Sequence, residues 1–287
     1  MNATNSYGTK DWFERMFSSA RDGHDEWGHQ WRASQKYRYS LTLSTIEELL
    51  SQRNPQSIVD LGCGLGDFTN LVRSINPKNI LRGMDISRNA VLGASRKYPQ
   101  IEFRSGELPD ISYAEKFDGI IALECVNYLD EKKRKTALNN MYNHLRPGGW
   151  FLFSSPIDDG SRYFSIDQVN GLFGRIGFRI HEIHYNYARL YTIFERPFLK
   201  ILHISQILRE MEIDPDKKWS GKKEVLHRIT LLPFMGYILE KMIKVSANVS
   251  CKMMRPIAFV RLFQWASRTF LGDRGKSHII IIAFKDE

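Results

Sequence analysis

One short stretch decides the fold: residues 58–68 read IVDLGCGLGDF. The apolar residues at its start predict a buried strand, and the glycines that follow predict a turn from which a helix opens. Glycine has no Cβ and reaches positive φ without penalty, so the backbone of such a turn can approach a ligand closely. The stretch therefore predicts a ligand-binding turn between a strand and a helix.

The spacing of the glycines narrows the kind of ligand. Gly62, Gly64 and Gly66 follow one another at intervals of two residues. A dinucleotide-binding turn has a third glycine three residues after the second, which seats a pyrophosphate. No Gly-Lys-Ser or Gly-Lys-Thr sequence follows, so a loop that cradles phosphates is disfavoured too. A ligand that carries ribose but no phosphate fits this turn better.

From this turn onward, strand-like and helix-like segments alternate, which is typical of a doubly wound parallel sheet. Residues 119–123 read GIIAL and are apolar throughout, as expected for a strand covered on both faces. The helical segments carry one apolar stripe each. The predicted strands are residues 57–61, 80–86, 101–104, 117–123, 150–154, 178–184 and 278–284. We therefore expect an α/β fold with a doubly wound, seven-stranded Rossmann-like sheet.

A basic segment interrupts the alternation before the last strand. Residues 186–277 contain helical patterns at 198–211, 225–245 and 257–271, which predict a helical insertion. The segment holds 17 Lys and Arg against 8 Asp and Glu, and this difference of +9 equals the net charge of the whole chain. Such helices could bind a phosphorylated or lipid-linked molecule or an anionic membrane surface. The alternative is a solvated basic face.

Composition sets further limits. Residues 10–38 are dense in aromatic side chains, which disordered segments lack, so ordered N-terminal helices are expected. The three cysteines are widely spaced without metal-ligand pairing, so no metal site is predicted. No long apolar run or signal-peptide pattern is present, which favours a cytoplasmic protein.

Two acidic residues follow strands near the glycine turn. Asp85 ends the next predicted strand, roughly 20 residues after the turn, where a carboxylate can accept hydrogen bonds from both hydroxyls of a ribose. The alternative for Asp85 is a helix cap ahead of Ser87. Glu107 follows the third strand, where it could accept from an adenine amino group while Leu108 packs on the ring. The alternative for Glu107 is a solvated loop charge.

These motifs resemble those of class I S-adenosylmethionine (SAM)-dependent methyltransferases. The resemblance covers roughly residues 37–185 and includes, in order, residues 60–66, Asp85, the Gly106-Glu107 turn and the RPGG turn at 146–149 before the fifth strand. It implies that the glycine turn holds the methionine moiety of SAM, which Asp60 orients through its amino group. It also implies that Asp85 binds ribose, that the third-strand loop binds adenine, and that the last strand lies antiparallel beside the sixth.

A finer similarity connects the chain with nodulation-factor-type N-methyltransferases, which modify an amine of a chitooligosaccharide. It rests on Trp27-Gly28, Gln35-Lys36-Tyr37, Thr42-Leu43 and the sequence ECVNYL at 124–129. It implies that Tyr37 lies near the methionine end of the cofactor and that the 124–128 loop lines the site. The long basic insertion departs from that pattern and leaves the acceptor open.

The predicted site combines these positions. The predicted cofactor-binding residues are Tyr37, Asp60, Gly62, Cys63, Gly64, Asp85, Ile86, Glu107, Leu108 and Leu123. Methyl transfer from a sulfonium is an in-line displacement from an activated donor, so the protein mainly aligns the reactants and removes water. A base helps when the acceptor is a hydroxyl or an ammonium group. Glu124 and Tyr128 are the predicted catalytic residues, and Asp158 and His184 are weaker candidates for the base.

The predicted organisation is an N-terminal helical lid (1–40), a SAM-binding core (41–185), a basic helical insertion acting as acceptor cap (186–277) and a final core strand (278–287). The predicted function is methyl transfer to N or O of a small-molecule, glycan or lipid-linked acceptor, with peripheral contact to an anionic membrane as a further prediction. The alternatives are an RNA methyltransferase and a non-catalytic SAM-binding or interaction protein. Methylation of nucleic acid bases is disfavoured, because Asp-Pro-Pro-Tyr, Asn-Pro-Pro-Tyr and Pro-Cys sequences are absent.

Overall fold

A computed structural model describes most of the chain, and its residues form two compact units. The described residues are 7–18, 25, 28–51, 54–111, 113–160, 163–213, 221, 224, 226 and 233–286. The first unit comprises residues 1–30, 35–187 and 276–287, and the second comprises residues 31–34 and 188–275. The sheet lies in the first unit, and the second unit is helical.

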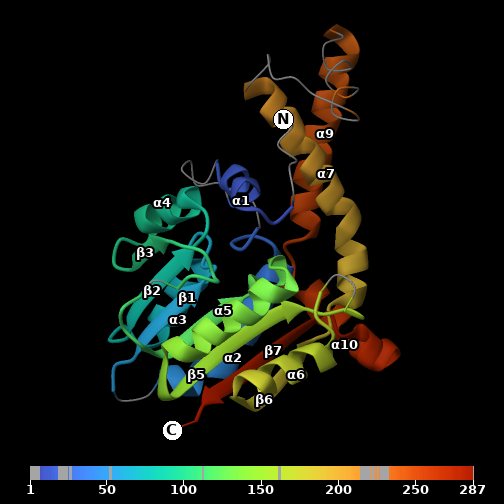
Figure 1. Cartoon of the computed structure of the whole chain (residues 1–287). Helices are drawn as coiled ribbons and strands as arrows, with labels where there is room; N and C mark the ends of the chain where they lie inside the picture. The colour runs from blue at the N-terminus through green and yellow to red at the C-terminus, as the bar shows by residue number, and fades with distance from the viewer. Residues whose placement is uncertain are drawn as a thin grey trace. The chain divides into compact units, whose positions relative to one another are not determined.

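The first unit is built on a seven-stranded sheet with the order β3-β2-β1-β4-β5-β7-β6. The strands are β1 (Ser57–Leu61), β2 (Ile80–Asp85), β3 (Glu102–Ser105), β4 (Phe117–Leu123), β5 (Leu145–Pro156), β6 (Phe178–Asn186) and β7 (His278–Lys285). Strands β1 to β5 pair in parallel, and β7 lies between β5 and β6 and is antiparallel to both. The predicted doubly wound, seven-stranded sheet is confirmed (Figure 1).

Helices cover both faces of this sheet (Figure 1). Helices α2 (Ala33–Leu50), α3 (Asp67–Ile75) and α4 (Arg88–Lys97) lie on one face, and α5 (Glu131–His144) and α6 (Ile166–Ile176) lie on the other. Helix α1 (Lys10–Met16) and the short 3₁₀ helix η2 (Val126–Tyr128) lie at the carboxyl ends of the strands. Successive residues of a strand point to opposite faces, so Ile120 packs with α5 and α6 while Ile121 packs with α2, α3 and α4. The apolar runs of the sequence are therefore explained by a sheet that is buried on both sides.

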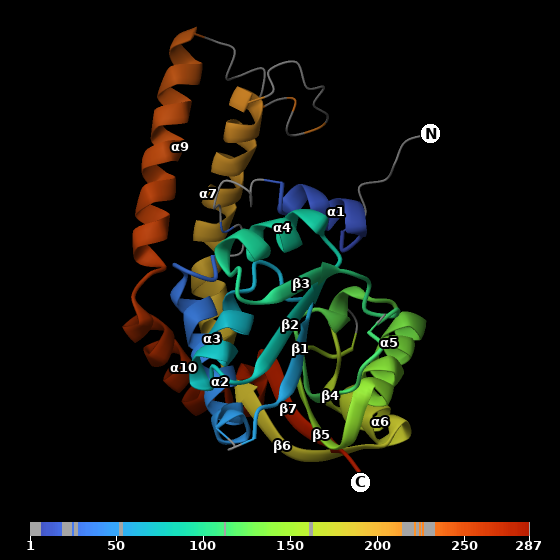
Figure 2. The same ribbon diagram turned by 90° about the vertical axis from the view of Figure 1, so that its left-hand side faces the viewer.

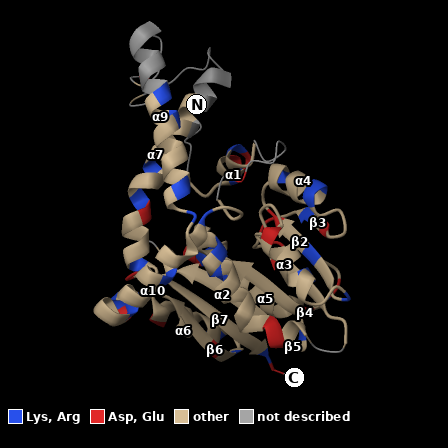
Figure 3. Cartoon of the chain, turned by 180° about the vertical axis from the view of Figure 1, so that it is seen from behind, with Lys and Arg blue, Asp and Glu red and all other residues tan. Residues whose placement is uncertain are grey.

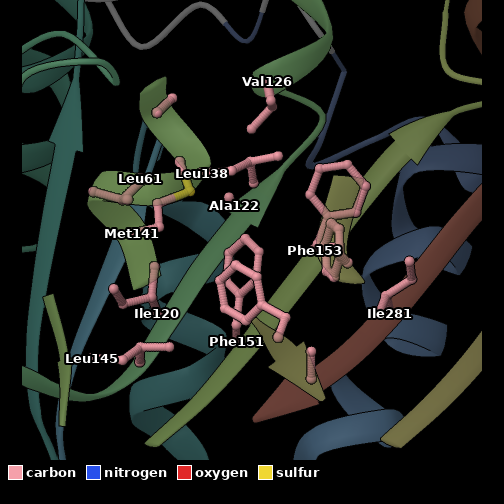
Figure 4. Close-up of a cluster of buried hydrophobic side chains, with 14 of the residues drawn as sticks. Leu61, Ile120, Ala122, Val126, Leu138, Met141, Leu145, Phe151, Phe153 and Ile281 are labelled. Carbon is pink, nitrogen blue, oxygen red and sulfur yellow. The ribbon is translucent and has the colours of Figure 1, made fainter. Parts of the chain in front are cut away.

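The core beneath α5 and α6 is the larger of the two layers. Figure 4 shows Phe151 and Phe153 of β5 facing Leu138 and Met141 of α5, with Ile281 of β7 beside them. All five side chains are fully buried. Burying an apolar side chain of this size stabilises the folded state by about 1.5–3 kcal/mol, so this layer fixes the ends of β4 and β5, which carry the 124–129 loop and Pro156.

Two segments begin earlier than the sequence predicted, α2 and β5. Helix α2 begins at Ala33 and runs on to Leu50, so no break separates a lid from a core at residue 41; Tyr39 and Leu41 extend its apolar face. Strand β5 begins at Leu145, because Leu145 pairs with Phe117 before the register shifts. The RPGG sequence therefore lies within β5.

The second unit contains α7 (Arg189–Ile213), α9 (Pro233–Met253), α10 (Ile257–Leu271) and the 3₁₀ helix η3 (Gly272–Gly275). Its interior includes the buried Tyr191 and a stacked ring pair, Phe194 and Phe263, with centroids 5.1 Å apart. Arg32 joins Glu195 through two hydrogen bonds of 3.1 and 2.7 Å. A buried ion pair of this geometry holds the short 31–34 segment on α7.

The helical insertion differs in extent from the predicted segments. Helix α7 starts earlier than predicted and passes through Pro197, and α9 continues past the predicted end to Met253. The start of the second predicted helix, at residues 225 and 227–232, lies outside the described residues, as does Trp27. The roles of lid and acceptor cap stay predictions.

Candidate active site

A cavity of about 570 Å³ opens at the carboxyl ends of β1, β2 and β4, within the first unit. In a doubly wound sheet this edge is where ligands bind. The lining includes residues 7–10, Phe13 and Phe17 from the N-terminal segment, residues 62–64, Asp85, Ile86, residues 106–109, residues 123–125, residues 127–130, Pro156 and Tyr163. The cavity therefore brings the glycine turn, the loop after β4 and the N-terminal segment together.

The glycine turn has no room for a side chain at Gly62 or at Gly66. Gly62 has φ 74°, and a Cβ added there would lie 2.5 Å from the Cβ of Cys125. At Gly66, with φ 75°, an added Cβ would lie 2.6 Å from the ring of Phe103. The amide N–H groups of Gly62 and Cys63 donate to the carbonyl of Met84, at 2.7 and 3.1 Å. Glycine is thus required by both conformation and space, and the turn is tied to the end of β2.

Asp60 is a buried carboxylate at the end of β1. Its Oδ2 accepts a hydrogen bond of 2.6 Å from Oγ1 of Thr69. The pKa of Asp60 is raised to about 7, mainly by burial and to a smaller extent by the nearby Asp85, against the lowering effect of the hydrogen bond from the Thr69 hydroxyl. A cationic ligand group beside this carboxylate would favour its ionised form. Asp60 is therefore suited to bind an ammonium group.

Asp85 ends β2 and faces the glycine turn. Its Oδ2 accepts from the N–H of Gly64 at 2.8 Å, and its Oδ1 accepts from the N–H of Ser87 at 2.9 Å. Burial raises its pKa to about 6, although both hydrogen bonds lower it. The N-cap of α4 is Ser87, whose Oγ accepts from the N–H of Ala90. Asp85 is therefore not the helix cap.

The loop after β3 forms the next part of the wall. Residues 106–109 line the cavity, and the N–H of Gly106 donates to the carbonyl of Asp85 at 3.0 Å. Leu108 packs against the core layer under α5. Glu107 also lines the cavity, so the predicted adenine position lies next to the predicted ribose position.

Nine of the ten predicted cofactor-binding residues line the cavity. The exception is Tyr37. On α2, Gln35 and Arg38 line the cavity and are hydrogen-bonded to one another, while Tyr37 is not among the lining residues. Positions i and i+3 share one helix face, and neighbouring residues point about 100° apart. Arg38 and Tyr39, and not Tyr37, line this part of the cavity wall, and the role of Tyr37 stays a prediction.

Glu124 follows β4 directly and lies in a cluster of charges. Among the described residues other than glycine it alone has a positive φ, of 57°. Its Oε1 accepts from Oγ of Ser154 at 2.7 Å, and its Oε2 lies 3.3 Å from Arg38 and 3.5 Å from His278. Burial alone would raise the pKa of Glu124, but His278, Arg38 and the Ser154 hydroxyl lower it below its usual value. Glu124 is therefore an ionised carboxylate that its contacts with Ser154, Arg38 and His278 hold in place.

Tyr128, the last residue of η2, belongs to an aromatic cluster. Its ring centroid lies 5.0 Å from that of Phe13 and 5.5 Å from that of Tyr7, and Trp12 closes the cluster at 6.3 Å. Burial raises the pKa of the Tyr128 phenol, and the Tyr7 side chain raises it further. Tyr128 is therefore a neutral phenol that lines the cavity.

The two weaker candidates for a base do not line the cavity. Asp158 accepts hydrogen bonds from the N–H groups of Gly160 and Tyr163, so it shapes the loop after β5. His184 lies on β6, where its Nε2 is 2.7 Å from Oε2 of Glu182. The structure therefore assigns both residues to local contacts.

No metal site is found among the residues that the structure describes. No group of three or more His, Cys, Asp and Glu side chains there could hold a metal ion. Burial raises the pKa of the Cys63 and Cys125 thiols well above the usual value, so both are neutral. Among the described helices, none is long and apolar enough to cross a membrane.

Comparison with known proteins gives one family match and several distant relatives. Residues 58–149 match a family described as a methyltransferase domain. A malonyl-[acyl-carrier protein] O-methyltransferase of Bacillus anthracis is 25% identical over 148 residues, which are 51% of this chain and 53% of that protein. A dTDP-3-amino-3,4,6-trideoxy-alpha-D-glucopyranose N,N-dimethyltransferase of Streptomyces venezuelae is 26% identical over 115 residues, 39% of this chain and 48% of that protein. The chain spans about half the length of these relatives.

Solved structures share the fold. The N-methyltransferase NodS from Bradyrhizobium japonicum WM9, solved with S-adenosyl-l-homocysteine, has a TM-score of 0.50 at 21% identity and covers 60% of this chain and 89% of its own. A sarcosine dimethylglycine methyltransferase-like protein from Galdieria sulphuraria has a TM-score of 0.56 at 11% identity and covers 96% and 99%. Together with the family match, this fold confirms the family resemblance drawn from the sequence.

Proposed function

We propose that this chain, which carries a class I SAM-dependent methyltransferase domain, transfers the methyl group of SAM to N or O of a small-molecule acceptor bound in the same cavity. One observation carries the proposal. The buried carboxylates of Asp60 and Asp85 lie at the carboxyl ends of two adjacent strands, beside a glycine turn that has no space for a side chain at Gly62 or Gly66. The family match concerns residues 58–149, so the activity of the whole protein is our inference.

The residues of this cavity fit the cofactor. SAM carries an ammonium group and a ribose diol, and the two carboxylates with raised pKa values are the acceptors that such groups need. Asp60 would hold the ammonium group and Asp85 the ribose hydroxyls, while Glu107 and Leu108 would bind adenine. When bound, SAM supplies an activated methyl group on a sulfonium.

The acceptor side of the cavity is formed by Glu124 and Tyr128. Because Arg38 and His278 keep Glu124 ionised, its carboxylate would accept a hydrogen bond from the acceptor and orient it, rather than take up a proton at neutral pH. The neutral phenol of Tyr128 can donate or accept a hydrogen bond. Alignment of the acceptor and exclusion of water by the surrounding rings are the main contributions of the protein to an in-line transfer.

We propose nitrogen and oxygen alike as acceptor atoms. The relatives include proteins named for O-methylation of a malonyl thioester and for N,N-dimethylation of an amino sugar nucleotide. Small molecules are the acceptor class that these names favour, and glycan or lipid-linked molecules extend it. A nucleic acid acceptor has no support in the cavity, which opens within one unit and is lined by buried carboxylates.

A transfer assay tests the proposal. Purified protein is incubated with SAM and a panel of amines, hydroxyls and carboxylates, and S-adenosylhomocysteine formation is measured. We expect acceptor-dependent product that Glu124→Gln reduces by about tenfold or more, since it removes a fixed charge at the acceptor. Glu48→Gln, an exposed position on α2, is the matched control. SAM binding without turnover on any acceptor would favour the non-catalytic alternative.

A further inference from the structure

Helix α9 of the second unit exposes an apolar stripe. Met242, Val245, Val249 and Met253 follow one another at helical spacing and are exposed, with Met242 at 63% and Val245 at 64%. The opposite face of α9 is the packed one, since Ala247, Ser250 and Met254 are buried there. The stripe is therefore separate from the helix face that forms the core of the unit.

Helix α10 repeats this arrangement. Leu262 and Trp265, three residues apart, are exposed at 56% and 59%, and Phe270 is exposed at 71%. Val260, Gln264 and Ser267 are buried on the other face. Isolated apolar residues on a surface are ordinary, but two consecutive helices that each expose several large apolar side chains indicate that each stripe is an interaction surface.

Basic residues border both stripes. Lys252 on α9, Arg255 between the helices and Arg261 on α10 are exposed. Residues 233–275 contain seven Lys and Arg against two Asp and Glu, a difference of +5. In Figure 3 the ribbon is blue at Lys and Arg positions along α9 and on α10. Lys252 lies about one turn from Val249, and Arg261 about one turn from Trp265, so charge and apolar surface share one side of each helix.

We propose that the exposed stripes of α9 and α10 dock on an anionic membrane surface. Amphipathic helices with Lys and Arg beside aromatic and aliphatic residues lie in the interface of a bilayer, with the apolar face among the acyl chains and the basic residues at the headgroups. Trp265 and Phe270 are the residue types that favour this depth. None of the described helices can cross a bilayer, so the binding is peripheral.

The basic residues beside the apolar stripes favour a membrane over a second copy of the chain or a nucleic acid as the binding partner. A second copy of the chain would bring two copies of the same basic surface together in a two-fold interface, and like charges repel. A nucleic acid would be held by the basic residues through its phosphates, and it would leave Met242, Val245 and Leu262 exposed to water. An anionic lipid surface satisfies both the charges and the apolar stripes.

Vesicle flotation of the full chain, without SAM or acceptor, tests the docking face. We expect binding to vesicles of phosphatidylcholine with 30% phosphatidylserine to exceed binding to phosphatidylcholine alone by about tenfold or more, and to weaken as salt is raised. Lys252→Glu with Arg261→Glu, and separately Leu262→Ser with Trp265→Ser, should each reduce binding by about tenfold or more. Because no cofactor is present, this outcome is independent of the proposed transfer.

Matched variants in the first unit are the controls. Lys78→Glu with Arg96→Glu reverses the same number of exposed charges, and Ile80→Ser with Leu92→Ser removes exposed apolar side chains; both should bind vesicles like the parent. Thermal melts establish that each variant folds. If the α9 or α10 variants unfold, the parent chain is mixed with vesicles of brominated anionic lipid. Quenching of its tryptophan fluorescence supports insertion into the bilayer, and unchanged fluorescence contradicts it. Equal binding to both vesicle types, no binding, or dimerisation that the Leu262 and Trp265 variant abolishes would overturn the proposal.

Discussion

The carboxylate of Glu14, on α1, accepts a hydrogen bond of 2.9 Å from the hydroxyl of Ser87, the N-cap residue of α4. The same carboxylate accepts from the backbone N–H groups of Arg88 at 2.8 Å and Asn89 at 3.1 Å. Figure 2 shows α1 beside α4. An acidic group at a helix N-terminus is stabilised by the free N–H groups and the helix dipole. Glu14 thus fastens α1 next to Asp85 and the cavity.

We predict that Glu14→Gln weakens SAM binding by up to about fivefold, because it removes roughly 1 kcal/mol of charge-dipole stabilisation that holds α1 over the cavity. Calorimetric titration gives the affinity, and stopped-flow measurement gives the dissociation rate, which should rise. Asp11→Asn, an exposed acidic position on the same helix, should leave both unchanged. An unaltered affinity and dissociation rate in Glu14→Gln would show that α1 does not retain the cofactor.

The affinity for SAM should rise with pH between about 5 and 8. In the ligand-free protein, burial raises the pKa of Asp60 to about 7 and that of Asp85 to about 6, so both are increasingly protonated as the pH falls. The ammonium group of SAM binds the ionised form of Asp60, and affinity should therefore fall by up to about tenfold per pH unit below the pKa. Titrations at several pH values measure this slope, and a flat profile would contradict the assignment of Asp60.

The same carboxylates give the ligand-free protein the opposite dependence of stability on pH. Their pKa values in the folded state lie above the ordinary value of 3.8, so their contribution to stability is fully present at low pH and is lost as the pH rises through 6 to 7. We expect Asp60→Asn to flatten this part of the stability curve. Denaturant unfolding from pH 5 to 8 measures it, and parallel curves for parent and variant would contradict the prediction.

Gly62→Ala should destabilise the fold and abolish cofactor binding. The alanine would have to adopt φ 74°, and its Cβ would lie only 2.5 Å from the Cβ of Cys125. A left-handed alanine alone costs about 1–2 kcal/mol in the free energy of unfolding, and the overlap adds to it. Gly171→Ala, within α6 and with no atom near its added Cβ, should instead be neutral or stabilising by about 0.5–1 kcal/mol. Equal effects of the two substitutions in a thermal melt would refute the steric argument.

Arg38→Gln should raise the pKa of Glu124. Arg38 is one of the groups that lower this pKa, so its removal moves ionisation of Glu124 toward neutral pH. If transfer needs the ionised carboxylate, the acid limb of the pH-rate profile shifts to higher pH, and kcat falls most on the acid side of neutral pH. Lys36→Gln, exposed on the same helix, is the control. A lower kcat with an unmoved acid limb would mean that Arg38 acts on another step.

The core sheet and the glycine turn were predictable because their signals are local. The strand from Ser57 to Leu61 was predicted with its observed bounds, since an apolar run and three glycines fix both its end and the following helix. Asp85 was predicted as well, because the alternation of strands and helices places it at the end of a neighbouring strand.

The missed features depend on contacts between distant residues. Glu14 and Ser87 are 73 positions apart, and nothing in the sequence near Glu14 marks it as a partner of another helix. The absence of Tyr37 from the residues that line the cavity depends on how α2 is rotated about its axis, which periodicity fixes only when the two faces of a helix differ clearly. The Ser154 and His278 partners of Glu124 come from two other strands, so its ionisation could be read only from the fold.

The cofactor claim is tested most directly by calorimetric titration of the full chain with SAM and with S-adenosylhomocysteine, alongside Asp85→Ala. The account predicts binding of both ligands to a single site and a loss of at least about tenfold in the variant, because two hydroxyl hydrogen bonds to a charged acceptor disappear. No binding of either ligand to folded protein, or equal binding by parent and variant, would contradict the assignment of this cavity as the SAM site.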